Sequence, residues 1–263
     1  VLSHYRANEH VSHLILNEKN SGSPFEQWNK GFALARGRYI WIAESDDFAD
    51  PDFLMQTVTV LDNNPDVSVV YTGSQMVDEN GAPISLDWDR FKRDVPLLDK
   101  YSSSLFLLRK MLWKTSIYNA SMALFRKECF ENVDKEYLSF KYCGDWFFWT
   151  EICKQGNVAS INRKLNYFRQ HTNKVSPKAE KDGLYFIEGA RVTERLMTQF
   201  DLTSYQRKVL AGRALKRLYK ATKGDLNLRQ SILDQKRYYS SGTYYSIILY
   251  VFDKWFNISG LHR

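Results

Sequence analysis

The chain has 263 residues, of which 44% are hydrophobic and 25% are charged. This composition is typical of one large or two small globular domains and excludes a disordered chain. The three cysteines, Cys129, Cys143 and Cys153, have no CxxC spacing, which excludes a disulfide scaffold, argues against a zinc site and indicates a reducing compartment. The longest apolar run, Tyr244 to Phe252, is far shorter than the ~20 residues that a membrane-spanning helix requires.

The net charge of +7 is unevenly distributed along the sequence. Residues 201–263 contain 12 Lys and Arg against 4 Asp and Glu, a charge of +8, whereas the rest of the chain contains 25 against 26. A basic segment beside a nearly neutral domain favours an anionic partner, which is nucleic acid, a membrane surface or a phosphorylated substrate. A solvated basic helix face is the alternative interpretation, and the sequence leaves it open.

Hydrophobic periodicity predicts alternating strands and helices in the first part of the chain. The predicted elements are a buried strand at 13–16, a helix from Phe25 to about Gly37, a buried strand at 39–43, a helix from Asp50 to about Pro65 and a buried strand at 67–71. Buried strands separated by helices indicate an α/β fold with a largely parallel sheet. Ligands of such sheets bind at the carboxyl ends of the strands.

The pattern changes from mixed to purely helical further along the chain. The predicted elements are helices at 103–113, 127–132 and 144–154, a strand at 120–125, one or two strands over 157–169, and then helices at 178–200, 204–222, 225–240 and 243–257. The change places a domain boundary near residue 175. The sequence therefore predicts an α/β domain over 1–175 and a helical C-terminal extension over 176–263.

The strongest chemical signal is Glu44-Ser45-Asp46-Asp47, in which three carboxylates directly follow a predicted buried strand. Carboxylate oxygens are the ligands that Mg²⁺ and Mn²⁺ prefer, and such a cation also holds a diphosphate. Closely packed carboxylates repel one another unless a cation joins them. The alternative is an acidic loop that caps the next helix, although Asp50 is already predicted to do this.

Two weaker signals lie further along the chain. Asp145, in Cys143-Gly144-Asp145-Trp146, opens an aromatic helix, so it is either an ordinary N-cap or a general base whose pKa is raised by apolar neighbours. His171 follows a predicted strand in Arg169-Gln170-His171, and it is either structural, a metal ligand or a phosphate contact. Each signal is weak alone, and the three signals strengthen one another.

Five segments, taken in order, resemble the family-2 type of GT-A glycosyltransferases. They are Asn20-Ser21-Gly22, Gln27-Trp28-Asn29-Lys30-Gly31, Ala35-Arg36-Gly37-Arg38-Tyr39-Ile40, Glu44-Ser45-Asp46-Asp47 and Asp50-Pro51-Asp52-Phe53-Leu54. The resemblance covers about residues 11–175, and its motifs are specific as an ordered set. It implies a Rossmann-like mixed sheet flanked by helices, and it identifies residues 1–175 as a GT-A domain.

The resemblance implies the transfer of a sugar from a UDP- or GDP-sugar to a hydroxyl of a saccharide or lipid-linked acceptor, by direct displacement with inversion. Glu44-Ser45-Asp46 stands where the family has its Asp-x-Asp motif, and Glu44 is one methylene longer than the usual Asp. The roles that the resemblance implies are Asp145 as the catalytic base, Asp46, Asp47 and His171 as ligands of Mn²⁺ or Mg²⁺, and Asn20, Gly22, Asn29, Glu44 and Asp46 as donor-binding residues.

Many relatives serve bacterial envelope polysaccharide synthesis, so the resemblance implies a cytoplasmic enzyme that is peripheral on the inner membrane face. The family normally opens with a strand, a helix and a second strand, and this chain starts at Val1 where those elements have just ended. The sequence therefore predicts that roughly 40–60 residues with the first strands are missing, judged from the ~30-residue size of a βαβ unit. Such a chain is expected to bind a nucleotide-sugar weakly, to be inactive, or to form homo-oligomers through an exposed sheet edge.

Two other classes of function remain open at this stage. A nucleotidyltransferase would share the acidic metal site and release pyrophosphate, but the sequence has no Gly-rich basic phosphate loop. A non-enzymatic nucleic-acid or membrane-binding module would use the basic helices, where aromatic residues interleave with cations, as in Lys216-Arg217-Leu218-Tyr219-Lys220. No recognised nucleic-acid motif is present, so no nucleic-acid partner is expected.

Overall fold

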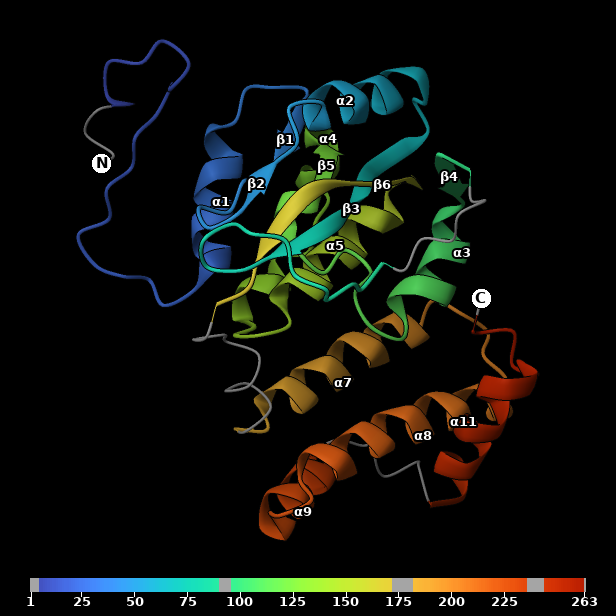
Figure 1. The fold of residues 1–263 in the computed structure, drawn as a ribbon. Coiled ribbons are helices and arrows are strands. Elements are labelled where there is room, and N and C mark those ends of the chain that lie inside the picture. The colour runs from blue at the N-terminus through green and yellow to red at the C-terminus, as the bar shows by residue number, and fades with distance from the viewer. Residues whose placement is uncertain (1–4, 90–95, 172–181, 236–243, 263) are drawn as a thin grey trace.

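A six-stranded sheet forms the centre of the computed structural model (Figure 1). The structure describes residues 5–89, 96–171, 182–235 and 244–262. The strands are β1 (Tyr39–Trp41), β2 (Phe48–Ala49), β3 (Val67–Val77), β4 (Leu98–Tyr101), β5 (Ala123–Arg126) and β6 (Asn157–Arg169). Their order is β1-β5-β3-β6-β2, and β4 pairs with β6 beside this path.

The direction of the strands brings three carboxyl ends to one edge of the sheet. β3 and β6 are parallel, with Val77 opposite Arg169, and the other pairs among the described strands are antiparallel. The mixed sheet that the resemblance implied is therefore confirmed, whereas the largely parallel sheet expected from the burial pattern is wrong, because burial does not report pairing direction. Since β5 is antiparallel to both β1 and β3, the strands β1, β3 and β6 end on the same side.

Helices cover both faces of the sheet. The elements are α1 (Pro24–Leu34), α2 (Phe53–Asn63), α3 (Ser103–Phe106), α4 (Lys127–Glu131) and α5 (Gly144–Lys154), with the short turns η2 (Leu107–Met111), η3 (Ala120–Met122) and η4 (Lys135–Ser139). On one face, Phe53 of α2 packs with Val70 of β3. On the other face, Phe32 of α1 stacks on Phe148 of α5, 5.4 Å between ring centroids, and Val69 of β3 belongs to this second cluster. Successive side chains of β3 point to opposite faces of the sheet, so they pack into two separate hydrophobic layers.

The strand predicted at 13–16 is wrong, because these residues form no regular element. Ile15 and Leu16 are 48% and 58% exposed. Figure 1 shows this N-terminal segment running away from the sheet. A strand needs a neighbouring strand for its backbone hydrogen bonds, and apolar composition alone does not provide one. The short strands β2 and β4 were missed for the opposite reason, since their pairing with β6 rather than their composition defines them.

Helices follow β6, as predicted: α7 (Leu184–Met197), α8 (Ser204–Ala221), α9 (Leu226–Gln235) and α11 (Tyr244–Phe256). Parts of the predicted helices, namely 178–181, 236–240 and residue 243, lie outside the described residues, as does the predicted boundary near 175. Phe186 of α7 and Leu210 of α8 belong to the same hydrophobic cluster as Trp146 of α5. The division into two domains stays a prediction, and the helices share a core with the α/β part.

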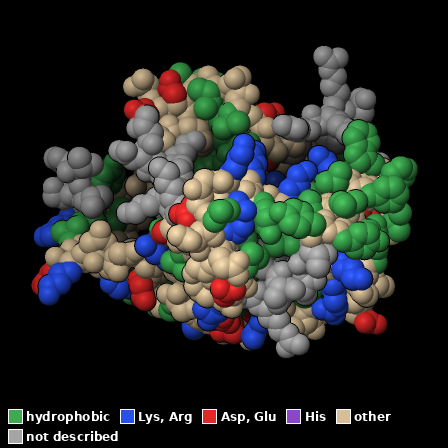
Figure 2. Space-filling view, turned by 90° about the horizontal axis from the view of Figure 1, so that it is seen from below, with side chains coloured by type: hydrophobic (Ala, Val, Ile, Leu, Met, Phe, Trp, Pro, Cys, Tyr) green, Lys and Arg blue, Asp and Glu red, His purple; other side chains and the backbone are tan. Residues whose placement is uncertain are grey.

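The helix α11 packs tightly on α8 with one face and leaves the other face exposed. Gly212 of α8 lies so close to α11 that a Cβ atom there would be 1.9 Å from the Ser246 carbonyl oxygen. The exposed face contains Tyr244, Tyr245, Ile248, Phe252, Trp255 and Phe256. Figure 2 shows this face as a hydrophobic cluster with Lys and Arg side chains nearby. Among the described residues, no helix is long and apolar enough to cross a membrane.

Candidate active site

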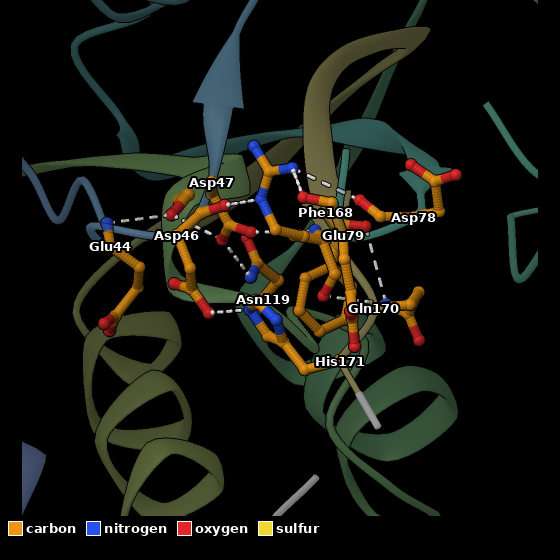
Figure 3. A network of polar contacts seen from close by, with 11 residues as sticks. Glu44, Asp46, Asp47, Asp78, Glu79, Asn119, Phe168, Gln170 and His171 are labelled. Carbon is orange, nitrogen blue, oxygen red and sulfur yellow. Dashed lines mark hydrogen bonds and ion pairs between the residues drawn. The ribbon is translucent and has the colours of Figure 1, made fainter. Parts of the chain in front are cut away.

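The carboxylate of Asp47 holds the acidic loop after β1, Glu44 to Asp47, in place through hydrogen bonds. Its Oδ2 accepts hydrogen bonds from Asn119 Nδ2 (2.6 Å) and Ser121 Oγ (2.9 Å), and its Oδ1 accepts one from the Arg169 backbone N–H (3.0 Å) (Figure 3). The Ser121 hydroxyl also accepts a hydrogen bond from the backbone N–H of Glu44 (3.0 Å). The loop is thereby tied to the segment before β5 and to the end of β6.

A buried polar chain continues from Asp47 into the sheet. Asn119 Oδ1 accepts a hydrogen bond from Asn166 Nδ2 (3.1 Å), which also donates to Ser74 Oγ (2.8 Å). Asn166 is fully buried, so these bonds replace those that its amide loses with water. Burial raises the pKa of Asp47, and the three hydrogen bonds that it accepts act in the opposite direction. The Asp47 carboxylate is therefore held in a fixed position rather than in open solvent.

Asp46 and His171 meet across the edge of the sheet, although they are 125 residues apart in sequence. His171 Nε2 lies 3.0 Å from Asp46 Oδ2, and the side chains are 41% and 47% exposed, respectively. Arg169 holds the two segments together, because its Nε donates to the Asp46 carbonyl (2.7 Å) and its Nη1 donates to the carbonyls of Asp78 (3.2 Å) and Glu79 (2.8 Å) (Figure 3). The ends of β1, β3 and β6 thus converge on one guanidinium group.

Glu44 lies on the other side of the acidic loop, against α1. Its Oε1 accepts a hydrogen bond from Trp28 Nε1 (3.1 Å). Partial burial raises the pKa of Glu44, and the nearby charges of Asp46 and Asp47 raise it further. The indole N–H opposes this shift, so Trp28 stabilises the ionised form of the carboxyl group.

Asp145 occupies the first turn of α5, which packs tightly on α1. A Cβ atom at Gly144 would be 2.4 Å from the Phe25 ring, so only glycine permits this approach. One carboxylate oxygen of Asp145 accepts the backbone N–H of Trp146 (2.7 Å). Burial raises the pKa of Asp145 to about 6, and the charges of Glu188 and Glu44 contribute to the rise.

The loop before Asp145 is held by a buried carboxylate from α7. Glu188 is 7% exposed, and it accepts hydrogen bonds from the backbone N–H groups of Lys141 (2.8 Å), Tyr142 (2.8 Å) and Cys143 (2.9 Å). Three N–H donors compensate for the burial of the charge. A C-terminal helix therefore fixes the start of α5 and the position of Asp145.

Asp145 lines a cavity of about 840 Å³, together with Trp146, Phe168 and Tyr185. The side chain keeps a part of its surface open to this cavity. A carboxyl group with a pKa of about 6 is ionised at neutral pH and accepts a proton more readily than an ordinary Asp. This arrangement suits a general base that acts on a molecule in the cavity.

The structure brings Asp46 and His171 into contact, with Asp47 and Glu44 in the same loop bonded to other partners, and the other predicted donor residues lie on the preceding segment. Among the described residues, no three His, Cys, Asp or Glu side chains form a group suited to a metal ion. The Asn20 side chain accepts the backbone N–H of Gly22 (2.9 Å), and Gly22 has a positive φ of 73° that favours glycine. Asn29 Oδ1 accepts a hydrogen bond from the Tyr137 hydroxyl (3.2 Å).

Five residues of this arrangement were missed by the sequence analysis. They are Trp28, Asn119, Ser121, Arg169 and Glu188. Arg169 lies two residues before the histidine that the sequence singled out, and Trp28 lies in one of the five motif segments, so both carried a signal. Asn119, Ser121 and Glu188 carried none, because their importance comes from contacts between segments that are distant in sequence.

Solved structures share this fold. S. aureus TarS (residues 1–349), determined in complex with UDP-GlcNAc, superposes with a TM-score of 0.66 at 16% identity, over 94% of this chain and 70% of that chain. At this identity the match shows the fold alone. A mixed sheet with an acidic loop at the carboxyl ends of its strands thus places the chain in the GT-A class.

The family follows from the sequence comparison. The model of glycosyl transferase family 2 matches residues 1–134, which is half of the chain. The chain belongs to this family. It is 32% identical over 81 residues to an uncharacterised glycosyltransferase of Methanocaldococcus jannaschii, and 23% identical over 171 residues to one of Haemophilus influenzae. These matches cover 31% and 62% of this chain, and 28% and 49% of the two relatives, so the chain spans less than half of their length.

The geometry predicts different effects for the two neighbouring aspartates. Asp47→Ala removes the acceptor of three hydrogen bonds, so we expect the free energy of unfolding to fall by about 1–3 kcal/mol. Asp46→Ala removes an exposed side chain, and we expect a change within about 0.5 kcal/mol. Urea denaturation followed by circular dichroism measures both values. Equal changes in the free energy of unfolding for the two substitutions would show that Asp47 does not hold the loop in place.

Proposed function

We propose that this glycosyltransferase transfers a sugar from a nucleoside-diphosphate donor to an acceptor hydroxyl with inversion, and that Asp145 is the catalytic base. The observation that carries the proposal is the position of Asp145, which lines a cavity of about 840 Å³ and has a pKa of about 6. The TarS complex with UDP-GlcNAc supports a UDP-sugar as the donor, ahead of a GDP-sugar.

The donor is proposed to lie against the acidic loop and the start of α1. Glu44 binds the donor from the acidic loop, with its carboxylate oriented by Trp28. Asn20, Gly22 and Asn29 complete the binding surface of the nucleotide and diphosphate. This assignment follows the family resemblance of these segments, and the closeness of Trp28 to Glu44 supports it because Trp28 lies next to Asn29 in α1.

The chemistry of Asp46 and His171 suits Mn²⁺ or Mg²⁺. One carboxylate oxygen of Asp46 and one imidazole nitrogen of His171 lie 3.0 Å apart and are exposed, so these two residues would hold such an ion together with oxygens of the bound diphosphate. Asp47, the third predicted ligand, already accepts three hydrogen bonds, so we assign it mainly the positioning of the loop. When bound, the cation stabilises the negative charge that develops on the leaving diphosphate.

The proposed step is a single displacement at the anomeric carbon. Asp145 takes the proton of the acceptor hydroxyl while the hydroxyl oxygen forms a bond to the anomeric carbon. The bond from this carbon to the diphosphate oxygen breaks on the opposite face, and the nucleoside diphosphate leaves with the electron pair. The configuration inverts because attack and departure occur on opposite faces, and the carbon resembles an oxocarbenium ion in the transition state.

The proposal predicts an acid limb in the pH profile. Since Asp145 acts as a base only when ionised, kcat/KM is expected to rise with pH up to about 6 and then to level off. Asp145→Asn is expected to lower kcat by roughly 10²–10⁴. The rates are measured as nucleoside diphosphate released from a panel of UDP- and GDP-sugars with a saccharide acceptor.

Asp201→Asn, at an exposed position away from the cavity, is the matched control and is expected to behave as the wild type. Retained turnover in Asp145→Asn would overturn the assignment of the base. Release of pyrophosphate in place of a nucleoside diphosphate would indicate a nucleotidyltransferase.

The cation site predicts a second result. Asp46→Ala and His171→Ala are expected to weaken Mn²⁺ binding in the presence of UDP by roughly tenfold or more, because each removes one of two protein ligands. Electron paramagnetic resonance of free Mn²⁺ measures the binding. Asp52→Ala is the control, since Asp52 is exposed and caps α2 without a side-chain hydrogen bond. Unchanged Mn²⁺ binding in both site variants would contradict the proposal.

We further propose that the enzyme acts in cell-envelope polysaccharide synthesis at the inner face of the membrane, with the exposed face of α11 on an anionic lipid surface. Trp255 is 82% exposed, Ile248 63% and Phe252 47%, and aromatic residues of this kind favour the interface between lipid and water. The charge of +8 in residues 201–263 complements anionic headgroups. Burial of the apolar side chains and attraction between the charges therefore both favour binding to an anionic membrane.

The lipid proposal predicts binding to vesicles that contain phosphatidylglycerol, and weaker binding to vesicles of phosphatidylcholine alone. The double variant Ile248→Ser/Trp255→Ser is expected to bind at least about tenfold more weakly, because two side chains no longer enter the lipid. Co-sedimentation measures the binding, and Met55→Ser, at a 60% exposed position of α2, is the control. Equal binding of the double variant, or a dimer in solution that covers this face, would contradict the proposal.

A further inference from the structure

The cavity at Asp145 adjoins a second cavity of about 620 Å³. Trp88, Lys114, Tyr118 and Arg213 line both cavities, and the two adjoining cavities together are called the hollow. Its far end is lined by Tyr250 and Lys254 of α11. The hollow therefore runs from the proposed catalytic base to the C-terminal helices.

Cations outnumber carboxylates along this hollow. The cations are Arg109, Lys110, Lys114, Lys141, Arg213, Arg217 and Lys254, and the carboxylates are Asp87, Asp89, Asp99 and Asp145. Three of the four carboxylates already have partners within the protein. Asp87 pairs with Lys164 (3.0 Å), Asp89 accepts a hydrogen bond from Tyr118 (2.9 Å), and Asp99 accepts one from Asn162 (2.9 Å). The walls thus present a net positive charge to whatever enters.

Lys114 stands at the junction of the two cavities and has an exposed side chain. The cavity walls desolvate its ammonium group, and Arg213, Arg217 and Lys110 repel it, so that its pKa lies below the usual range. Asp89 opposes this shift only in part. An anion placed between these cations would relieve the repulsion.

Two arginines on one face of α8 are oriented by aromatic rings. Arg213 lies over the ring of Trp113, 4.9 Å from its centroid, and donates to the Trp113 carbonyl. Arg217 lies over the ring of Tyr185, 5.2 Å from its centroid, and donates to the Tyr185 hydroxyl (3.1 Å). Stacking fixes the guanidinium planes, and planar guanidinium groups match the geometry of phosphate oxygens. The positive charge of the hollow is therefore pre-organised.

The hollow is separate from the proposed donor residues. Glu44, Asp46 and His171 are not among the residues that line either cavity. The helix α8, which supplies Arg213 and Arg217, also lies outside the part of the chain that the family model matches. This positive charge is thus a feature of the acceptor side of the protein.

We propose that the hollow binds an acceptor that carries phosphate groups, with one phosphate between Lys114, Arg213 and Arg217 and a nearby hydroxyl at Asp145. The inference rests on the proposed function in taking Asp145 as the group that the acceptor hydroxyl approaches. Phosphate of this kind comes either from a polymer of phosphodiester units or from a lipid-linked diphosphate. Both sources share the chemistry that the arginines and Lys114 recognise.

Binding is tested without turnover, so the result does not depend on whether Asp145 is the base. With UDP and Mn²⁺ at saturation, the wild type is titrated with a glycerol phosphate oligomer, with farnesyl diphosphate and with neutral maltohexaose. The fluorescence of Trp88, Trp113 and Trp146, which line the hollow, reports binding. We expect at least one phosphate compound to bind and maltohexaose not to bind. The compound that binds more tightly identifies the polymer or the lipid as the source.

Lys114→Gln and Arg217→Gln are each expected to weaken binding of that compound about tenfold, because each removes a charge-assisted contact. Lys223→Gln, an exposed position after α8, is the matched control and is expected to bind as the wild type. Thermal unfolding of Lys114→Gln verifies the fold, since this side chain is exposed. The proposal is overturned if neither phosphate compound binds, if the variants bind normally, if maltohexaose binds equally well, or if UDP displaces the phosphate compound.

Discussion

The position of the candidate active site depends on one half-buried carboxylate, that of Asp47. Partial burial of this charge costs free energy, and the cost is offset by three donors on two segments: Asn119, Ser121 and the backbone of Arg169. Because the donors come from the segment before β5 and from the end of β6, the ionised form of Asp47 holds these segments to the loop after β1. Asp46 and His171 then meet as a consequence of this attachment.

The C-terminal helices are part of the same arrangement. Glu188 of α7 accepts hydrogen bonds from three backbone N–H groups before α5, of which that of buried Cys143 would otherwise lack a partner. The first turn of α5 can approach α1 only because residue 144 is glycine. α7 and α8 also supply Tyr185 and Arg213 to the cavity that Asp145 lines. The helices therefore both hold the candidate base and form the wall opposite to it.

Much of the architecture could be predicted from hydrophobic periodicity, because long elements with one buried face carry that pattern in their own residues. The helices α1, α2, α5 and α8 and the strands β3 and β6 were found in this way. The segment 13–16 has the composition of a strand and no described partner, so it forms none. Strand pairing depends on neighbours distant in sequence, which also explains why β2 and β4 were missed.

The sequence by itself determined the family and the residue types of the candidate site, because the ordered motifs from Asn20 to Leu54 and the separate signal at Asp145 lie in short, continuous segments. The tertiary structure alone decided what each group contacts. It placed His171 beside Asp46, gave Asp47 its three donors, set Glu188 beneath the loop before Asp145, and gathered Lys114 and Arg213 around one hollow. The physical reason is that hydrogen bonds and ion pairs act over a few ångströms in space, and only folding brings such distant residues within that range.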